Sequence, residues 1–318
     1  MEKKHEENYK TNMFFVAAVA VICTMLWGTA FPAIKIGYEI FRIDSGDIPT
    51  KLIFAGARFF LAGIIVIALG LLTEKNKRTM LLKKKDILPV AVLGFFQTFC
   101  QYILLYIGIV HITGTKSSIL TSVSAFGSVL LSAVFWKSDR LNLQKLLGCM
   151  IGIAGIIVMN FDGGGLLGFT IIGDGLVILS NLSGAIGNIV SKKISENRKP
   201  AQISGWQLTI GGAALILIGI IFGGKLNFYN TECAAILIYL AAMAGIAFML
   251  WTMLLFYNPV SKVAVFNLLI PVFGTMWSGI FLSENIFTFN NLLSLILVCS
   301  GIFLVNSSSL QHKKVIKN

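Results

Sequence analysis

Amide and indole side chains interrupt the apolar stretches of this 318-residue chain, and they can hydrogen-bond a polar solute. Gln97 and Gln101 are four residues apart, so a helix would place both on one face. Amides buried in apolar surroundings are expensive and usually face the interior of a helical bundle. Stripes of Ser and Thr more often serve helix packing. We predict a neutral cavity lined by Trp27, Gln97, Gln101, Thr121, Asn181, Asn188, Trp251 and Asn267.

Ionisable side chains are scarce in the same stretches. Arg58 is the one strong charge, and it can bind an anionic solute group, pair with Glu39 or Asp44, or donate to helix-end carbonyls. No Asp or Glu lies deep in an apolar stretch, so the buried carboxylate that proton-coupled carriers commonly use is missing. The sequence has no metal-ligand cluster and no GxxxxGK[ST] motif, so we expect no metal, no cofactor and no ATP-driven step.

The stretch LWGTAFPAIKIG (26–37) puts a proline and a lysine into an apolar run. Pro32 removes one backbone hydrogen bond and bends a helix, and Gly28 lies one turn before it. Pro271 stands in another apolar run. We predict that Gly28, Pro32 and Pro271 are hinge or gating positions; a static bend that only aids packing is the alternative.

The composition requires lipid around these elements. The chain is 56% hydrophobic and 13% charged, whereas soluble domains are about 45–50% apolar and about 25% charged. Apolar runs of spanning length recur along the whole chain, which predicts an all-α integral membrane protein. We expect ten transmembrane helices, near residues 13–36, 52–73, 87–110, 115–136, 144–160, 172–193, 201–223, 232–256, 261–282 and 287–306.

The basic residues predict an orientation. One alternating set of loops and tails carries 20 Lys and Arg residues and the other carries 5, within a net charge of +12. The positive-inside rule then places the tails 1–12 and 307–318 in the cytoplasm and the chain in the cell membrane. A nucleic-acid binder would gather its basic residues on one folded face, so we expect no nucleic-acid partner.

Residues 125–160 and 272–306 resemble each other. With a one-residue gap, the matched residues are Phe126 with Phe273, Gly127 with Gly274, Gly155 with Gly301, and Asn160 with Asn306. Since each unit would hold an odd number of helices, the second unit must enter the membrane from the opposite side. We therefore predict two inverted five-helix repeats, 13–160 and 172–306; chance similarity between apolar segments is the alternative.

These motifs resemble the EamA-type members of the drug/metabolite transporter (DMT) superfamily. The resemblance rests on LWGTAFPAIKIG, on ARFFLAG (57–63), and on LLIPVFGTMWSGIFLSE (268–284) in the second copy of the repeat. It implies ten helices in two inverted halves, a central cavity, and movement of small metabolites, often export of amino acids. The family often has proline and an acidic end in its fourth helix, where this chain has Ser124 and Lys137. Because ARFFLAG recurs irrespective of substrate, we favour a structural role for Arg58.

We therefore predict a secondary transporter that exports an amino acid or related solute across the cytoplasmic membrane by alternating access, as a facilitator or exchanger. Its partners would be the small-molecule substrate and the lipid bilayer, with the chain a monomer or homodimer. A translocator of lipid-linked substrates, which needs a lateral opening between helices, is the alternative. An integral-membrane enzyme is disfavoured, because the spans hold no cluster of catalytic carboxylates or metal ligands, and we expect no catalytic residue.

Overall fold

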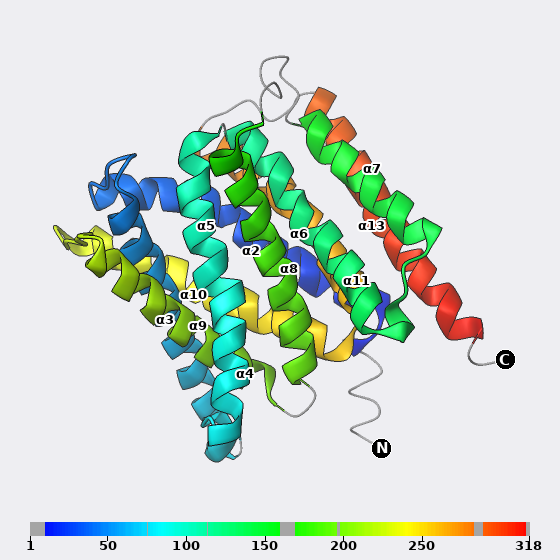
Figure 1. The fold of residues 1–318 in the computed structure, drawn as a ribbon, viewed down its shortest axis with the longest axis horizontal. Coiled ribbons are helices and arrows are strands. Elements are labelled where there is room, and N and C mark those ends of the chain that lie inside the picture. The colour runs from blue at the N-terminus through cyan, green and yellow to red at the C-terminus, as the bar shows by residue number, and fades with distance from the viewer. Residues whose placement is uncertain are drawn as a thin grey trace.

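The computed structural model describes residues 10–74, 76–112, 114–159, 169–195, 198–282 and 289–315, and within these ranges it contains helices and no strand (Figure 1). The α-helices are α2 (Met13–Ile40), α3 (Ile48–Thr73), α4 (Lys84–Gly94), α5 (Gln101–Gly108), α6 (Gly114–Phe135), α7 (Leu143–Met159), α8 (Leu176–Ser195), α9 (Pro200–Ile221), α10 (Thr231–Tyr257), α11 (Val260–Ala264), α12 (Leu269–Leu282) and α13 (Phe289–Val315). The short 3₁₀ and π segments are η1 (Lys77–Met80), η2 (Phe95–Cys100), η3 (Ile109–His111), η4 (Lys137–Asp139), η5 (Ile171–Gly175) and η6 (Val265–Leu268).

Eight helical segments in the described part of the chain are long and apolar enough to cross a membrane. Two further apolar helices, Leu120–Phe135 and Leu143–Val158, are shorter and coincide with the fourth and fifth predicted spans. The protein is therefore a multi-pass, all-helical membrane protein, while the count of ten spans stays a prediction. Asn160, one of the matched repeat residues, lies outside the described residues.

Side-chain caps and prolines set where several helices begin. The Asn12 side chain accepts a hydrogen bond from the Phe14 amide at the start of α2, and Asp47 accepts one from Thr50 at the start of α3. Asn230 does the same for Cys233 in α10. These side chains satisfy amide groups that the first turn of a helix leaves without a backbone partner.

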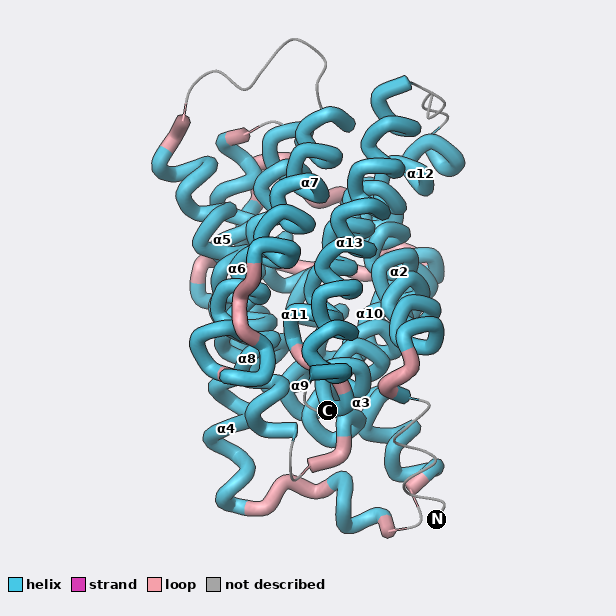
Figure 2. The backbone as a smooth tube through the Cα atoms, turned by 90° about the vertical axis from the view of Figure 1, so that its right-hand side faces the viewer, coloured by secondary structure: helices cyan, strands magenta, loops and turns pink. Residues whose placement is uncertain are grey.

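Small residues bring pairs of helices into close contact. Helix α3 lies along α9, and α7 lies along α13, as Figures 1 and 2 both show. A Cβ atom on Gly148 of α7 would lie 2.7 Å from the Gly301 carbonyl oxygen of α13, and one on Gly301 would lie 2.5 Å from the Gly148 oxygen. Such contacts replace the hydrophobic driving force that is missing between helices in lipid.

The third and ninth predicted spans are interrupted by segments that are not α-helical. The third passes through the π segment η2 between α4 and α5, and the ninth passes through the 3₁₀ segment η6 between α11 and α12. Pro271 lacks the N–H that would bond the Asn267 carbonyl, which accounts for the change of helical type just before it. Both irregular segments contribute residues to the cavity described next.

Candidate functional site

A cavity of about 490 Å³ lies among the helices. The side chains around it come from α2, α3, α6, α8 and α10 and from the irregular third and ninth spans. All eight residues predicted to line such a space do so: Trp27, Gln97, Gln101, Thr121, Asn181, Asn188, Trp251 and Asn267. Their role in binding a substrate stays a prediction.

Asn188 is the centre of the polar network in this cavity. Its Oδ1 accepts hydrogen bonds from Trp251 Nε1 at 3.0 Å and from Gln97 Nε2 at 3.4 Å. Its Nδ2 donates to Ser128 Oγ at 3.1 Å. One amide on α8 therefore connects the third span, α6 and α10, and the four side chains fix one another's orientation.

The other predicted amides have more local partners. Asn181 Nδ2 donates to the Val177 carbonyl of its own helix at 2.8 Å. Gln101 lies against Gly184, where a Cβ atom would be 2.8 Å from the Gln101 Oε1 atom. The glycine thus makes room for the Gln101 side chain beside α8.

Several buried polar atoms of the cavity lack a hydrogen-bond partner among the described residues. They are the donors Trp27 Nε1 and Arg58 Nε and the acceptors Gln97 Oε1 and Asn267 Oδ1. A buried polar group without a partner costs about 1–3 kcal/mol. Unpaired donors and acceptors around one space are therefore ready to bind a polar ligand.

Arg58 lies on α3, roughly 15 Å along the helix from its start. Its side chain is 3% exposed and lines the cavity. Neither Glu39 nor Asp44 forms an ion pair with it, and no hydrogen bond to a helix-end carbonyl is present among the described residues. Its guanidinium carbon instead lies 4.3 Å from the centre of the Phe59 ring and 5.8 Å from that of Tyr102.

An aromatic wall connects Arg58 with the amide network. The ring centres of Phe59 and Tyr102 are 4.5 Å apart, and those of Phe59 and Phe248 are 6.2 Å apart. Trp27 then packs edge-on against Phe248 at 5.3 Å and against Trp251 at 5.1 Å. Phe59 and Phe248 were not among the predicted lining residues, because a Phe in an apolar run carries no signal that separates a cavity wall from a lipid-facing position.

The cavity reaches the surface near the C-terminal end of α2. Its lining includes Lys35, which is exposed, and Phe31, which is 50% exposed. In the opposite direction the helices close together. One turn before Trp27, Cys23 is fully buried, and just after Trp251, Leu254 and Leu255 are fully buried. The cavity therefore opens at one end of the bundle and ends near its middle.

Beyond the closed end, a buried ion pair joins three segments. Asp139 of η4 is 2.6 Å from Lys145 of α7, and both side chains are at most 5% exposed. The Asp139 carboxylate also accepts hydrogen bonds from the Ser261 amide of α11 at 3.0 Å and from the Ser261 hydroxyl. Nearby, Lys262 donates to the Thr11 carbonyl and to Asn258 Oδ1. Polar contacts thus hold this end together.

The three predicted hinge residues lie outside the cavity lining. Gly28 is a close crossing point of α2 and α12, where a Cβ atom would lie 2.7 Å from the Phe273 Cβ atom. Pro32 is buried inside α2. Pro271 is in the first turn of α12. Whether any of them moves stays a prediction.

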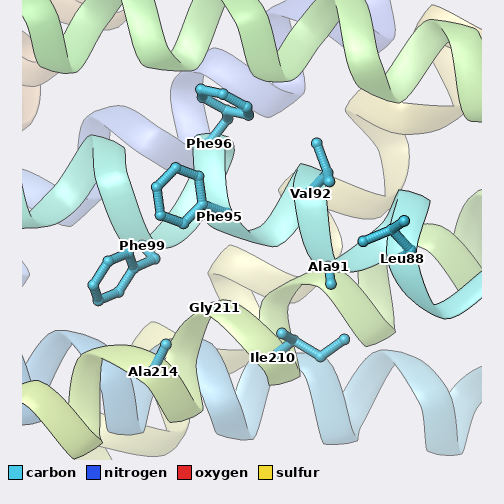
Figure 3. A pocket seen from close by; sticks show the side chains of 9 residues that line it. All are labelled: Leu88, Ala91, Val92, Phe95, Phe96, Phe99, Ile210, Gly211 and Ala214. Carbon is cyan, nitrogen blue, oxygen red and sulfur yellow. The ribbon is translucent and has the colours of Figure 1, made fainter.

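A second hollow of about 450 Å³ lies between the third span and α9 (Figure 3). Its lining side chains are all apolar, and Leu88, Val92 and Phe95 are exposed. It shares no lining residue with the polar cavity. An apolar groove on the outside of a membrane bundle suits lipid chains and offers no group that could orient a polar solute.

The described residues contain no group of His, Cys, Asp and Glu side chains that could hold a metal ion. The five cysteines are free. The side chains that line the cavity can hold a solute through hydrogen bonds, charge and aromatic contacts.

Comparisons with known proteins identify relatives over nearly the whole length. A model described as the EamA-like transporter family matches residues 14–161 and again residues 171–307. The chain is 24% identical over 300 residues to the uncharacterized transporter YoaV of Bacillus subtilis (strain 168), covering 92% of this chain and 96% of the relative. It is 26% identical over 312 residues to a probable amino-acid metabolite efflux pump of Escherichia coli (strain K12), covering 94% and 97%. A solved crystal structure shares the fold, with a TM-score of 0.76 at 17% identity over 93% of this chain and 98% of the other.

Proposed function

Because the chain belongs to the EamA-like transporter family, we propose that it is a secondary transporter that exports an amino acid or related metabolite across the cytoplasmic membrane by alternating access. The observation that carries the proposal is the polar cavity, which opens at one end of the bundle and is closed at the other. Such a space gives a solute access from one side at a time. The relative named as an amino-acid metabolite efflux pump supports the substrate class and the outward direction.

The pattern of helix contacts supports two inverted five-helix repeats. Counted as ten spans, α2 packs against α12, the ninth span, and α8, the sixth, packs against α6, the fourth. If the first half is exchanged with the second, the pairing of spans one and nine becomes the pairing of spans six and four. The pairings of α3 with α9 and of α7 with α13 each map onto themselves. A rocking motion of two such halves about a central site would alternate the open side.

Residues matched between the repeats also occupy equivalent contacts. Gly127 of α6 lies against Leu182 and Ala185 of α8, and Gly274 of α12 lies against Phe31 of α2. The two glycines thus each face the first helix of the other half. In the second matched pair, each glycine contacts the last helix of the other half. Gly155 of α7 contacts α13, and Gly301 of α13 contacts α7.

The membrane orientation follows from the basic loops. The proposal places both termini in the cytoplasm. The cavity, which opens beside the C-terminal end of α2, then faces the outside, and the Asp139–Lys145 pair lies on the cytoplasmic side. In this arrangement the buried ion pair and the Lys262 contacts form the closed cytoplasmic gate.

The cavity lining favours a facilitator or exchanger over a proton-coupled carrier. Among the residues that the structure describes, no Asp or Glu lines the cavity. A carrier driven by protons commonly uses such a carboxylate, whose protonation changes with burial. The alternative function is translocation of a lipid-linked substrate, which needs a lateral opening from the cavity to the lipid. The apolar groove of Figure 3 does not provide one, because it shares no lining residue with the polar cavity.

Uptake into proteoliposomes of the purified protein tests the proposal. Labelled amino acids and their derivatives would be supplied with and without an imposed pH gradient. We expect saturable uptake that the gradient does not change and that unlabelled solute inside the vesicles accelerates. Uptake that requires the gradient would contradict the facilitator mechanism, and absence of saturable uptake of any solute would contradict the transport function.

A further inference from the structure

The charged side chains around the polar cavity all have one sign in the part of the chain that the structure describes. There, Lys35, Lys51 and Arg58 line the cavity and no carboxylate does. Lys35 is exposed near the opening, while Lys51 bonds the Ser45 carbonyl and lies 5.2 Å from the Tyr38 ring centre. Basic groups on the walls of a cleft raise the local concentration of anions and oppose the entry of cations.

Arg58 is the deepest of these cations, and its own surroundings leave it without a counter-ion. It is 3% exposed, its Nε has no acceptor, and no carboxylate pairs with it among the described residues. A buried charge is expensive unless it is paired, and the other buried cations of the described chain have oxygen partners. Lys145 bonds Asp139, and Lys262 bonds Thr11 and Asn258. Arg198, which is only partly buried, bonds Asp86 at 2.8 Å.

The unpaired acceptors of the cavity indicate that the ligand also carries a hydrogen-bond donor. Gln97 Oε1 and Asn267 Oδ1 are neutral oxygens that need an O–H or N–H donor. The rings of Trp27, Phe248 and Phe59 line the same space. The site therefore offers a cation, neutral acceptors and an apolar aromatic wall around one cavity.

We propose that the cavity selects small organic acids of net negative charge, with the carboxylate on Arg58, an apolar body on the aromatic wall, and a hydroxyl or amide N–H on Gln97 and Asn267. This rests on the proposed transport function and narrows its substrate class. A 2-hydroxy acid or an N-acylated amino acid has these groups. A free amino acid has the same shape but brings an ammonium group into a cavity whose described lining holds three cations and no carboxylate.

Matched pairs of solutes test the charge preference on the unmodified protein. Phenyllactate and phenylalanine differ only in a hydroxyl against an ammonium group, and so do 2-hydroxyisocaproate and leucine. Trp27 and Trp251 line the cavity, so ligand binding can be followed by intrinsic fluorescence as well as by uptake into proteoliposomes. We expect each hydroxy acid to bind at least about tenfold more tightly than its amino-acid partner, the factor that one charge-assisted contact supplies.

Substitutions of Arg58 test where the carboxylate binds. Arg58→Gln is expected to weaken binding of phenyllactate at least about tenfold, while binding of the uncharged amide 3-phenylpropionamide stays unchanged. Arg58→Lys should restore part of the affinity, because it keeps the charge but not the planar fork. The matched control is Arg42→Gln, since Arg42 is exposed, lies 4.8 Å from the Tyr229 ring centre and does not line the cavity.

The outcomes separate this inference from the transport proposal. Saturable transport with equal or tighter binding of the amino acids would overturn the inference and leave the transport function standing. Equal affinity of the Arg58→Gln protein and the unmodified protein for phenyllactate would overturn it too. So would the absence of detectable binding of any of these acids at concentrations up to about 1 mM. If the Arg58 variants do not fold, the solute pairs on the unmodified protein still decide.

Discussion

Asn188 shows how a single amide can organise a membrane cavity. Its side-chain carbonyl oxygen accepts hydrogen bonds from Trp251 and Gln97, and its amide nitrogen donates to Ser128, so groups from three other spans share one side chain. In an apolar interior these bonds have little competition from solvent. Removing the amide therefore affects both stability and the shape of the cavity wall.

Replacing Asn188 tests this role at the residue scale. Asn188→Leu leaves the Trp251 N–H and the Gln97 amide without their partner, at a cost of about 1–3 kcal/mol for each buried group. We expect a lower midpoint of thermal unfolding in detergent and weaker solute binding. The matched control is Asn181→Leu, because Asn181 lines the same cavity but its amide bonds only a carbonyl of its own helix among the described residues. Equal destabilisation by the two substitutions would contradict the prediction.

At the scale of elements, the helices depart from α geometry where they meet the cavity. Gln97 stands in the π segment η2, and Asn267 stands in the 3₁₀ segment η6 before Pro271. Such segments change the direction of side chains relative to a regular helix and are frequent at functional sites. They place the unpaired Gln97 and Asn267 oxygens at the same space.

The second element-scale feature is the Asp139 cluster, which ties η4, α7 and α11 together at the closed end. Asp139→Ala would leave Lys145, which is 4% exposed, without its carboxylate. Breaking a buried pair in this way costs about 3–5 kcal/mol. We expect a large fall in the midpoint of thermal unfolding and a loss of transport.

The double variant Asp139→Ala/Lys145→Met removes the uncompensated charge as well. It should recover part of the stability that the single variant loses, because the penalty comes mainly from the isolated ammonium group. A double variant no more stable than Asp139→Ala would show that the cluster acts through the Ser261 contact instead.

At the scale of the whole molecule, alternating access requires the two ends of the bundle to face different compartments. Gly46, in the connection after α2, and Ser138, in η4, are both exposed at opposite ends of the proposed topology. In a variant without its native cysteines, we expect a membrane-impermeant maleimide to label Gly46→Cys in intact cells. Ser138→Cys should be labelled after permeabilisation alone, because the basic loops stay inside. The reverse pattern would invert the proposed orientation and make the cavity cytoplasmic.

The sequence by itself determined the class of protein and the amide side chains of the candidate lining. Hydropathy acts over each span separately, so the apolar runs indicated a multi-pass helical protein without knowledge of its packing. Amides such as Gln97 and Asn188 stood out because lipid penalises them wherever the helices pack. The family resemblance, which the family match confirms, came from local motifs of the same kind.

The tertiary structure decided what those residues meet. Nothing local separates Phe59 and Phe248 from lipid-facing phenylalanines, and the π segment at Gln97 has no proline to announce it. Proximity in sequence made Glu39 and Asp44 reasonable partners for Arg58, yet neither pairs with it among the described residues. Whether a buried charge has a counter-ion depends on side chains from several helices at once, and the packing of α3 among its neighbours settles that question.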